Sequence, residues 1–204
     1  MEHSSSSSYA RTKRAMDVAF SATGVFLLSP LLVAVAIAVR LDSPGPVLFR
    51  HERVGRNGRK FGVLKFRSMT HGSRGAEVTA AGDPRITRVG RVLRRTKIDE
   101  LPQLFNVLSG DMSLVGPRPE VARYVSMFSR DYEEILKVPP GITDPAAVEY
   151  RDEERLLAAS ADPEAQYSQV VLPAKIALYR RYLAERSLWT DLKIIGRTFA
   201  ALIH

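Results

Sequence analysis

Two adjacent carboxylates, Asp99 and Glu100, follow a basic stretch at residues 94–97 where a helix is predicted to begin. A helix N-terminus carries partial positive charge and unpaired N–H groups, so it stabilises anions and binds phosphate. Nearby cations lower the pKa of a carboxylate. We therefore expect Asp99 to stay ionised and to act as a nucleophile toward phosphorus. The pair also suits Mg²⁺, which prefers oxygen ligands; helix capping together with Thr96 is the alternative.

Two cations elsewhere in the chain are candidates for binding phosphate. Arg118 stands between Pro117 and Pro119, and proline fixes the backbone angle φ near −65°, which limits the freedom of the guanidinium. Arginine suits bidentate recognition of phosphate. Lys65, in a predicted strand over residues 61–66, supplies a further point charge. The alternatives are an ordinary structural turn for Arg118 and a solvent-facing position for Lys65.

Other common kinds of site are not indicated. The chain has no cysteine, so it forms no disulfide and no thiolate zinc site. Its four histidines are scattered without metal-ligand spacing, and neither a glycine-rich phosphate loop nor a Ser-His-Asp pattern is found.

A long apolar run near the N-terminus is the first element expected to position these candidate site residues. Residues 18–39 form a stretch of 22 residues without a charged side chain, with Ser29-Pro30 at its centre. Such a run is long enough to cross a bilayer as a helix, but a proline removes one backbone donor and clashes with the preceding turn. Basic residues flank both ends, and an excess of Lys and Arg marks the cytoplasmic side. These features predict a re-entrant membrane helix over residues 13–40, broken at Ser29-Pro30, after a flexible polar leader over residues 1–12.

The charge of the chain is unevenly distributed. Its 30 Lys and Arg and 22 Asp and Glu give a net charge of +8. Residues 1–97 carry 18 basic and 6 acidic side chains (+12), whereas residues 98–204 carry 12 and 16 (−4). A basic half beside an apolar run favours the surface of an anionic membrane. It equally favours phosphate-bearing substrates, and a solvated basic surface is the alternative.

The remainder, residues 41–204, is predicted to form a small globular domain that is mostly helical. Asn57-Gly58 is a strong hairpin signal between short strands over residues 47–49 and 61–66. The apolar spacing predicts helices, of which the first is basic and amphipathic and suits a membrane interface. These helices lie over residues 86–93, 101–108 (ended by Gly110), 123–136 and, for the most part, 173–203. The predicted fold class is therefore α/β, mostly helical, in a monotopic membrane protein.

Several ordered motifs resemble those of the bacterial sugar transferases of the monotopic phosphoglycosyl transferase family. The resemblance runs from about Lys13 to Arg151 and continues more weakly toward the C-terminus. We expect no extra N-terminal transmembrane helices, so the chain resembles the small, minimal form of the family. The motifs are Lys13-Arg14-Ala15-Met16-Asp17, Leu28-Ser29-Pro30, Asp42-Ser43-Pro44-Gly45-Pro46, Arg53-Val54-Gly55-Arg56-Asn57-Gly58, Lys65-Phe66-Arg67-Ser68-Met69, Thr87-Arg88-Val89-Gly90-Arg91, Asp99-Glu100-Leu101-Pro102-Gln103-Leu104 and Met112-Ser113-Leu114-Val115-Gly116-Pro117-Arg118-Pro119-Glu120.

The resemblance implies a membrane enzyme that moves a sugar-1-phosphate from a UDP-sugar to undecaprenyl phosphate. It gives Asp99 the role of nucleophile, on which a covalent phospho-sugar forms as UMP departs. It gives Glu100, with Asp99, the role of binding Mg²⁺.

Other site positions are also implied by the resemblance. Lys65, Arg94 and Arg118 match positions that contact phosphate or support the site, and Ser29-Pro30 matches the break of the re-entrant helix. Arg151 matches a position expected to contact the nucleotide.

One segment departs from the family pattern. Many members read Pro-Gly-Ile-Thr-Gly-Trp-Ala-Gln-Val-Asn-Gly-Arg, whereas residues 140–151 here read Pro-Gly-Ile-Thr-Asp-Pro-Ala-Ala-Val-Glu-Tyr-Arg. The Gly-Trp pair is lost, and acidic residues are gained at Asp144, Glu149 and positions 152–154. The sequence therefore leaves the sugar undetermined.

We expect UDP-sugar and undecaprenyl phosphate as substrates, Mg²⁺ as cofactor and lipids of the bacterial inner membrane as surroundings, with no nucleic acid as partner. The expected location is the cytoplasmic face of that membrane, at the first membrane step of glycoconjugate assembly. The oligomeric state stays open, with a homodimer as one option. Two alternatives remain: a membrane-tethered nucleic-acid binder, because basic helices bind phosphate backbones, and a non-catalytic scaffold.

Overall fold

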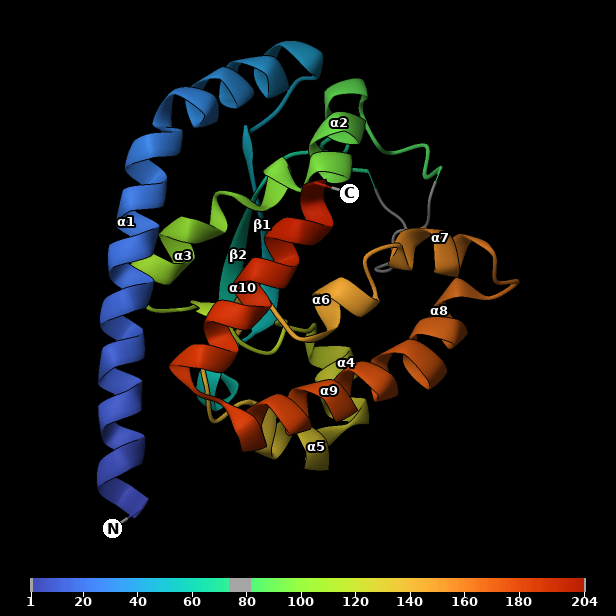
Figure 1. Ribbon diagram of the computed structural model, residues 1–204. Coiled ribbons are helices and arrows are strands. Elements are labelled where there is room, and N and C mark those ends of the chain that lie inside the picture. The colour runs from blue at the N-terminus through green and yellow to red at the C-terminus, as the bar shows by residue number, and fades with distance from the viewer. Residues whose placement is uncertain (1, 74–81, 204) are drawn as a thin grey trace.

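The computed structural model describes residues 2–73 and 82–203, without the side chains of residues 2–7, 148, 202 and 203. Helices dominate this part of the chain, and the strands form two small sheets (Figure 1). β1 (Leu48–Val54) pairs antiparallel with β2 (Lys60–Phe66), and β3 (Ser113–Val115) pairs parallel with β4 (Gly141–Thr143). The mostly helical fold with a hairpin is confirmed; the parallel pair was not predicted. The helices are α1 (Glu2–Asp42), α2 (Arg88–Thr96), α3 (Gln103–Ser109), α4 (Ala122–Met127), α5 (Ser129–Ile135), α6 (Ala146–Glu149), α7 (Glu153–Ala158), α8 (Pro163–Gln166), α9 (Leu172–Glu185) and α10 (Leu188–Ile203).

α1 is one long helix that bends. In Figure 1 it runs along one side of the molecule and then turns over the top. Pro30 lies inside the helix and explains the bend, because sharp helix bends occur mostly at proline. Proline lacks the N–H that would reach the carbonyl oxygen of Phe26, and the Ser29 hydroxyl donates to that oxygen instead, at 2.8 Å. The helix is therefore bent at this point but not interrupted.

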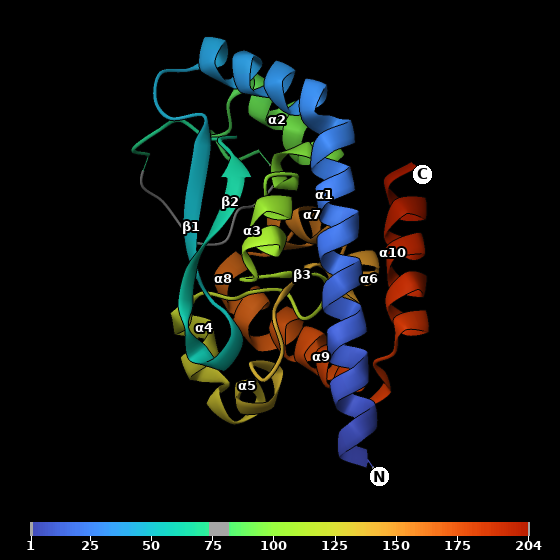
Figure 2. The same ribbon diagram turned by 90° about the vertical axis from the view of Figure 1, so that its left-hand side faces the viewer.

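The N-terminal end of α1 is held against α10. α1 begins at Glu2, so the described part of the predicted flexible leader, residues 2–12, is helical here. The Tyr9 hydroxyl and the Lys13 ammonium both donate to Oδ2 of Asp191, at 3.1 and 2.8 Å. α10 lies beside this part of α1 in Figure 2. Sequence reasoning missed this contact because its partners are almost the whole chain apart.

α1 is also tied to the centre of the molecule. The Arg14 guanidinium donates to the carbonyl oxygens of Val107 and Leu108, at 2.6 and 3.0 Å, where α3 ends. The carboxylate of Asp17 accepts from the Ser113 hydroxyl at 2.8 Å and from the Leu114 N–H at 3.2 Å, both on β3. Past the bend, a buried cluster joins α1 to β2 and α2; its buried members are Val35, Val39, Phe66 and Leu93.

The first hairpin forms as the Asn-Gly signal predicts. Asn57 and Gly58 both have positive φ, 57° and 74°, which these residue types accept more readily than others. Directly after β2, the buried guanidinium of Arg67 donates to the carbonyl oxygens of Val39 (3.0 Å), Ser43 (2.6 Å) and Pro46 (2.5 Å). The hairpin therefore also fixes the turn by which the chain leaves α1.

α2 and α3 pack closely on β2. A Cβ added to Gly90 would lie 2.0 Å from the carbonyl oxygen of Ser68, so only glycine permits this approach of α2. On α3, the buried amide of Asn106 accepts from the Leu64 N–H and donates to the Gly62 carbonyl oxygen, both at 2.9 Å. The Asn106 side chain thus provides hydrogen-bond partners for two backbone groups on the edge of β2 that does not pair with β1. Together the two contacts place the segment between α2 and α3 beside Lys65.

The C-terminal half surrounds a second, larger core. The predicted helix over residues 123–136 is divided into α4 and α5, because Phe128 leaves the helical region at φ −119° and ψ 40°. A π-helical turn, Tyr167–Val171, joins α8 to α9. Aromatic residues from α4, α5, α9 and this turn are buried together, which explains how short helices form a stable layer; they are Tyr124, Tyr132, Tyr167 and Tyr179.

Candidate active site

Asp99 and Glu100 lie in a 3₁₀ turn, Ile98–Glu100, between α2 and α3. They were predicted at the start of a helix, but α3 begins three residues later, at Gln103. Lys97 reverses the chain in front of them with a left-handed φ of 57°. The Thr96 hydroxyl donates backward to the carbonyl oxygens of α2 and does not cap the turn. The capping alternative for the acidic pair is therefore not what this structure shows.

Glu100 is the point at which two cations meet. Its Oε1 accepts from Lys65 Nζ at 2.7 Å and from Arg118 Nη2 at 2.6 Å, and the Glu100 side chain is only 14% exposed. Its Oε2 has a contact of 3.5 Å with Arg118 Nη1. Burial alone would raise the pKa of Glu100, but Arg118 and Lys65 outweigh it and hold that pKa well below its usual range. Glu100 is therefore ionised and links β2 to the loop after β3.

Asp99 is buried and incompletely paired. The residue is 5% exposed, and its Oδ1 has no hydrogen-bond partner among the residues that the structure describes. Burial raises the pKa of Asp99, and Lys65 and Arg94 oppose that rise only in part. The expectation that cations would lower this pKa is therefore wrong, because burial outweighs them. An ionised carboxylate with a free buried oxygen is in a high-energy state, which suits a nucleophile.

Arg94, on α2, lies near Asp99 and forms an ion pair with Glu154. Its Nη2 donates to Oε1 of Glu154, on α7, at 2.5 Å. Its Nε is buried without a partner in the described part of the chain. Arg94 is also one of the cations that partly oppose the rise in the pKa of Asp99 caused by burial.

Arg151 is the predicted site residue that the structure does not bring to the others. It is exposed on the turn between α6 and α7. Within residues 2–73 and 82–203, no hydrogen bond or ion pair of its side chain is found. The structure therefore gathers Lys65, Arg94, Arg118 and the acidic pair, and leaves Arg151 at the surface.

Asp144 is an acidic residue near the site. Its location beside Arg118 could not be predicted from the sequence. β4 pairs parallel with β3, and the Gly116 N–H donates to the Thr143 carbonyl oxygen at 3.1 Å. Asp144 and Arg118 thus leave the same end of this small sheet. Burial raises the pKa of Asp144, and Arg118 and Lys175 oppose that rise. The departure of residues 144–145 from the family pattern drew attention to Asp144, but nothing in the sequence pointed to Lys175.

The acidic pair fits the predicted Mg²⁺ to a limited degree. No group of three or more His, Cys, Asp or Glu side chains suited to a metal is found in the described residues. Glu100 Oε1 is shared by two cations, whereas Glu100 Oε2 and Asp99 Oδ1 are not closely paired. Mg²⁺ is commonly bound by one or two carboxylates and completes its shell with waters and substrate phosphates. These two oxygens are the ones with which the acidic pair would hold the ion.

Asp99, whose Oδ1 has no partner among the described residues, thus lies near the cations Lys65 and Arg94, an arrangement suited to binding phosphate. The chain belongs to the bacterial sugar transferase family, whose model matches residues 8–204. The sequence resemblance to that family is thereby confirmed.

Curated relatives of known name support the assignment. The chain is 42% identical over 202 residues to the UDP-N-acetylgalactosamine-undecaprenyl-phosphate N-acetylgalactosaminephosphotransferase of Aeromonas hydrophila, covering 96% of this chain and 44% of that protein. It is 42% identical over 196 residues to the UDP-glucose:undecaprenyl-phosphate glucose-1-phosphate transferase of Caulobacter vibrioides, covering 94% and 69%. An Escherichia coli K12 protein of the latter name is 40% identical over 192 residues, covering 91% and 39%. The chain thus spans less than half of two of these relatives.

Proposed function

We propose that this protein transfers a sugar-1-phosphate from a UDP-sugar to undecaprenyl phosphate, through a covalent intermediate on Asp99. The observation that carries the proposal is the buried Asp99, whose Oδ1 has no partner among the described residues and which lies beside Lys65, Arg94 and Glu100. The names of the relatives supply the substrate class.

The proposed reaction proceeds in two displacements. An oxygen of Asp99 attacks the phosphorus that bears the sugar, and the bond from that phosphorus to the bridging oxygen breaks, so UMP leaves with the bridging oxygen. An oxygen of undecaprenyl phosphate then attacks the same phosphorus and frees the Asp99 carboxylate. With two steps, the two large substrates need not occupy the site together.

The cations and Glu100 have supporting roles in this reaction. Phosphoryl transfer relies mainly on positioning and on neutralising charge. Lys65 and Arg118 would face the phosphate oxygens, and Glu100 fixes the positions of both cations. When bound by Glu100 Oε2 and Asp99, Mg²⁺ would neutralise charge on the diphosphate.

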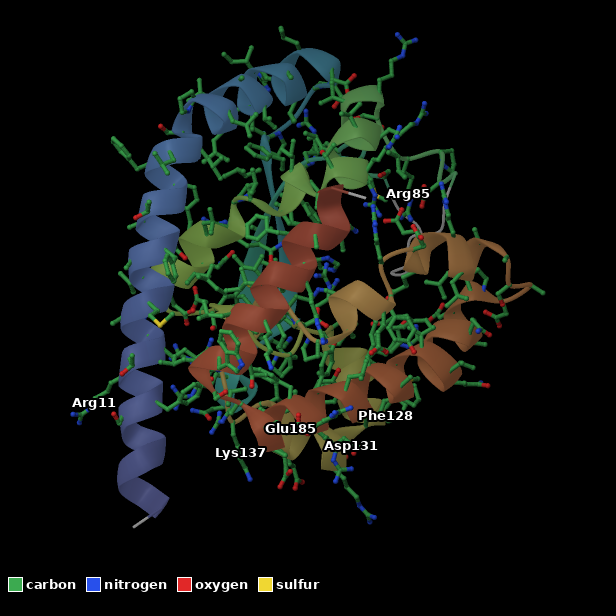
Figure 3. The ribbon with its side chains drawn as sticks, viewed as in Figure 1. Arg11, Arg85, Phe128, Asp131, Lys137 and Glu185 are labelled. Atoms are coloured by element: carbon green, nitrogen blue, oxygen red, sulfur yellow. The ribbon has the colours of Figure 1, made fainter. Side chains whose placement is uncertain are left out.

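We further propose that α1 enters and leaves the membrane on the cytoplasmic side. Between Ser8 and Asp42 it is long and apolar enough to cross a membrane, yet it bends and carries basic residues at both ends. Arg11 points away from the rest of the molecule (Figure 3). Since lipid offers no water to a freed carbonyl group, the Ser29 bond to Phe26 would make the bend tolerable there. Apolar side chains exposed on α1 would meet the lipid; they include Phe20, Phe26, Leu27, Val33 and Ile37.

The function is tested by a screen of UDP-sugars. The purified full chain, in detergent with Mg²⁺ and undecaprenyl phosphate, is incubated with UDP-N-acetylgalactosamine, UDP-glucose and related donors. Repeated release of UMP, over many turnovers, is expected with at least one donor and requires undecaprenyl phosphate; without the lipid, each protein molecule releases at most one UMP. If a thermal unfolding measurement shows that the protein is folded and no donor releases UMP, the proposed activity is rejected.

The topology is tested with single cysteines, for which the cysteine-free chain is a clean background. Cysteines replacing Ala10 and Arg50, both exposed, are labelled with a membrane-impermeant maleimide in inside-out and right-side-out vesicles. Both are expected to react in inside-out vesicles only, because both ends of α1 would face the cytoplasm. A cysteine replacing Phe26, 78% exposed in the protein, is the control and should resist labelling in lipid. Reaction of positions 10 and 50 from opposite sides would mean that α1 crosses the membrane.

A further inference from the structure

Arg94 and Glu154 form an ion pair between two segments that meet at the site. Arg94 lies on α2, five residues before Asp99, and Glu154 lies on α7, 60 residues later in the chain. The Arg94 side chain is 20% exposed and the Glu154 side chain 40% exposed. Glu154 belongs to the acidic stretch at residues 152–154 by which this chain departs from the family pattern. A negative side chain thus pairs with Arg94, which the sequence resemblance places among the positions that contact phosphate or support the site.

The pair uses only part of what Arg94 offers. The Nε and Nη2 groups form one edge of a guanidinium, which can donate two parallel hydrogen bonds to a single anion. Glu154 accepts from Nη2 alone, at 2.5 Å, and the buried Nε has no partner among the described residues. A phosphate group that bonded both donors would therefore satisfy Arg94 better than Glu154 does.

Glu154 can leave Arg94 without unfolding α7. The neighbouring Glu153 is paired with the buried Lys175, whose ammonium lies 5.6 Å from the ring centroid of Tyr150 and 5.2 Å from that of Tyr167. These contacts hold the start of α7 in place. Because Glu154 is partly exposed, rotation of its side chain alone would bring its carboxylate into water.

From this geometry we infer that Glu154 is an affinity-determining residue that competes with the diphosphate of the donor for Arg94. The inference rests on the proposed function for the identity of the anion. Between turnovers Glu154 neutralises Arg94, and a bound diphosphate takes both the Nη2 and the Nε donors. Release of the product returns Arg94 to Glu154, so the acidic stretch sets how tightly nucleotides are held.

The test measures the binding of UDP and of inorganic pyrophosphate to the full chain in detergent by calorimetry, at fixed Mg²⁺. The substitution Glu154→Gln is expected to lower both dissociation constants by about two- to six-fold, because it frees Arg94 from a partly exposed partner of modest strength. Unchanged or weaker binding would overturn the inference, since a residue that merely orients Arg94 would weaken binding when replaced. The variant's KM for the UDP-sugar should fall with kcat not increased.

Two controls separate this competition from a general charge effect. Glu149→Gln, an exposed residue of α6 in the same segment, makes the same change in net charge and should leave binding unchanged. In an Arg94→Gln background, Glu154→Gln should bring no gain; a gain that persists there would overturn the inference. The binding readout does not require transfer, so failure of the UMP-release screen would be recognised separately.

Discussion

Replacement of Asp99 by asparagine is expected to abolish UMP release and to leave the protein at least as stable as the wild type. Loss of a nucleophile removes the covalent route, so activity should fall at least about 10³-fold. Burial raises the pKa of Asp99, which means that its ionised form opposes folding at neutral pH. The uncharged amide removes that cost. A residue that served only structure would show the reverse pattern, with lower stability and retained activity.

The measurement is UMP release together with thermal unfolding at two pH values. Any stability advantage of Asp99→Asn should shrink as the pH falls through the raised pKa of Asp99, where the wild-type carboxyl is also neutral. For the same reason, the activity of the wild type should decline on acidification at a higher pH than an ordinary aspartate near 3.9 would give. Asp111→Asn, an exposed aspartate after α3, is the matched control and should retain activity. Full activity of Asp99→Asn would reject its role as nucleophile.

Replacement of Glu100 by glutamine is expected to lower both stability and activity. Lys65 and Arg118 would keep their charges but lose the carboxylate that both contact, at 2.7 and 2.6 Å. Removing one partner of a buried ion pair costs about 3–5 kcal/mol, and the partial exposure of these two cations brings the expected loss to about 2–3 kcal/mol. Activity should fall about 10²-fold, because the cations would no longer be held toward the phosphates.

Chemical unfolding at several pH values tests this expectation. The pKa of Glu100 is lowered in the folded state, so its stabilising effect is present above the ordinary glutamate range and is lost as the pH falls through the lowered value. The stability gap between wild type and Glu100→Gln should thus stay constant down to about pH 4.3 and close only in stronger acid. Glu52→Gln breaks the Glu52–Lys60 pair, where Glu52 is 68% exposed, and should change stability by less than about 1 kcal/mol. A similar loss in both variants would contradict the role given to Glu100.

Local patterns in the sequence predict much of the fold. The hairpin follows from Asn57-Gly58, because their positive φ values are a property of these residues themselves. Likewise, Gly110 ends α3 with a φ of 92°, as predicted. The pairing of β3 with β4 was missed because each strand has three residues and the two lie far apart in the chain. Periodicity cannot identify such short strands.

The sequence predicted which residues form the candidate site better than it predicted their burial, ionisation and partners. The motifs named Lys65, Arg118 and Glu100, and the structure brings these three together. Asp99 was expected to be ionised easily, but the sequence shows which charges lie near it and not how deeply it is buried. The partner of Arg94, Glu154, lies 60 residues later in the chain. A single sequence does not show which residues so far apart are in contact.

The packing of α1 has a consequence for how this protein can be handled and how it can evolve. Val35 and Val39 of α1 share a buried cluster with Phe66 and Leu93, and Asp17 is bonded to the strand that leads to Arg118. A truncated protein starting at residue 41 would therefore expose part of its own interior and lose a support of its active site. α1 is therefore an integral part of the packed structure. Exchanging it between relatives should succeed only when the residues facing it on β2, α2 and β3 are exchanged with it.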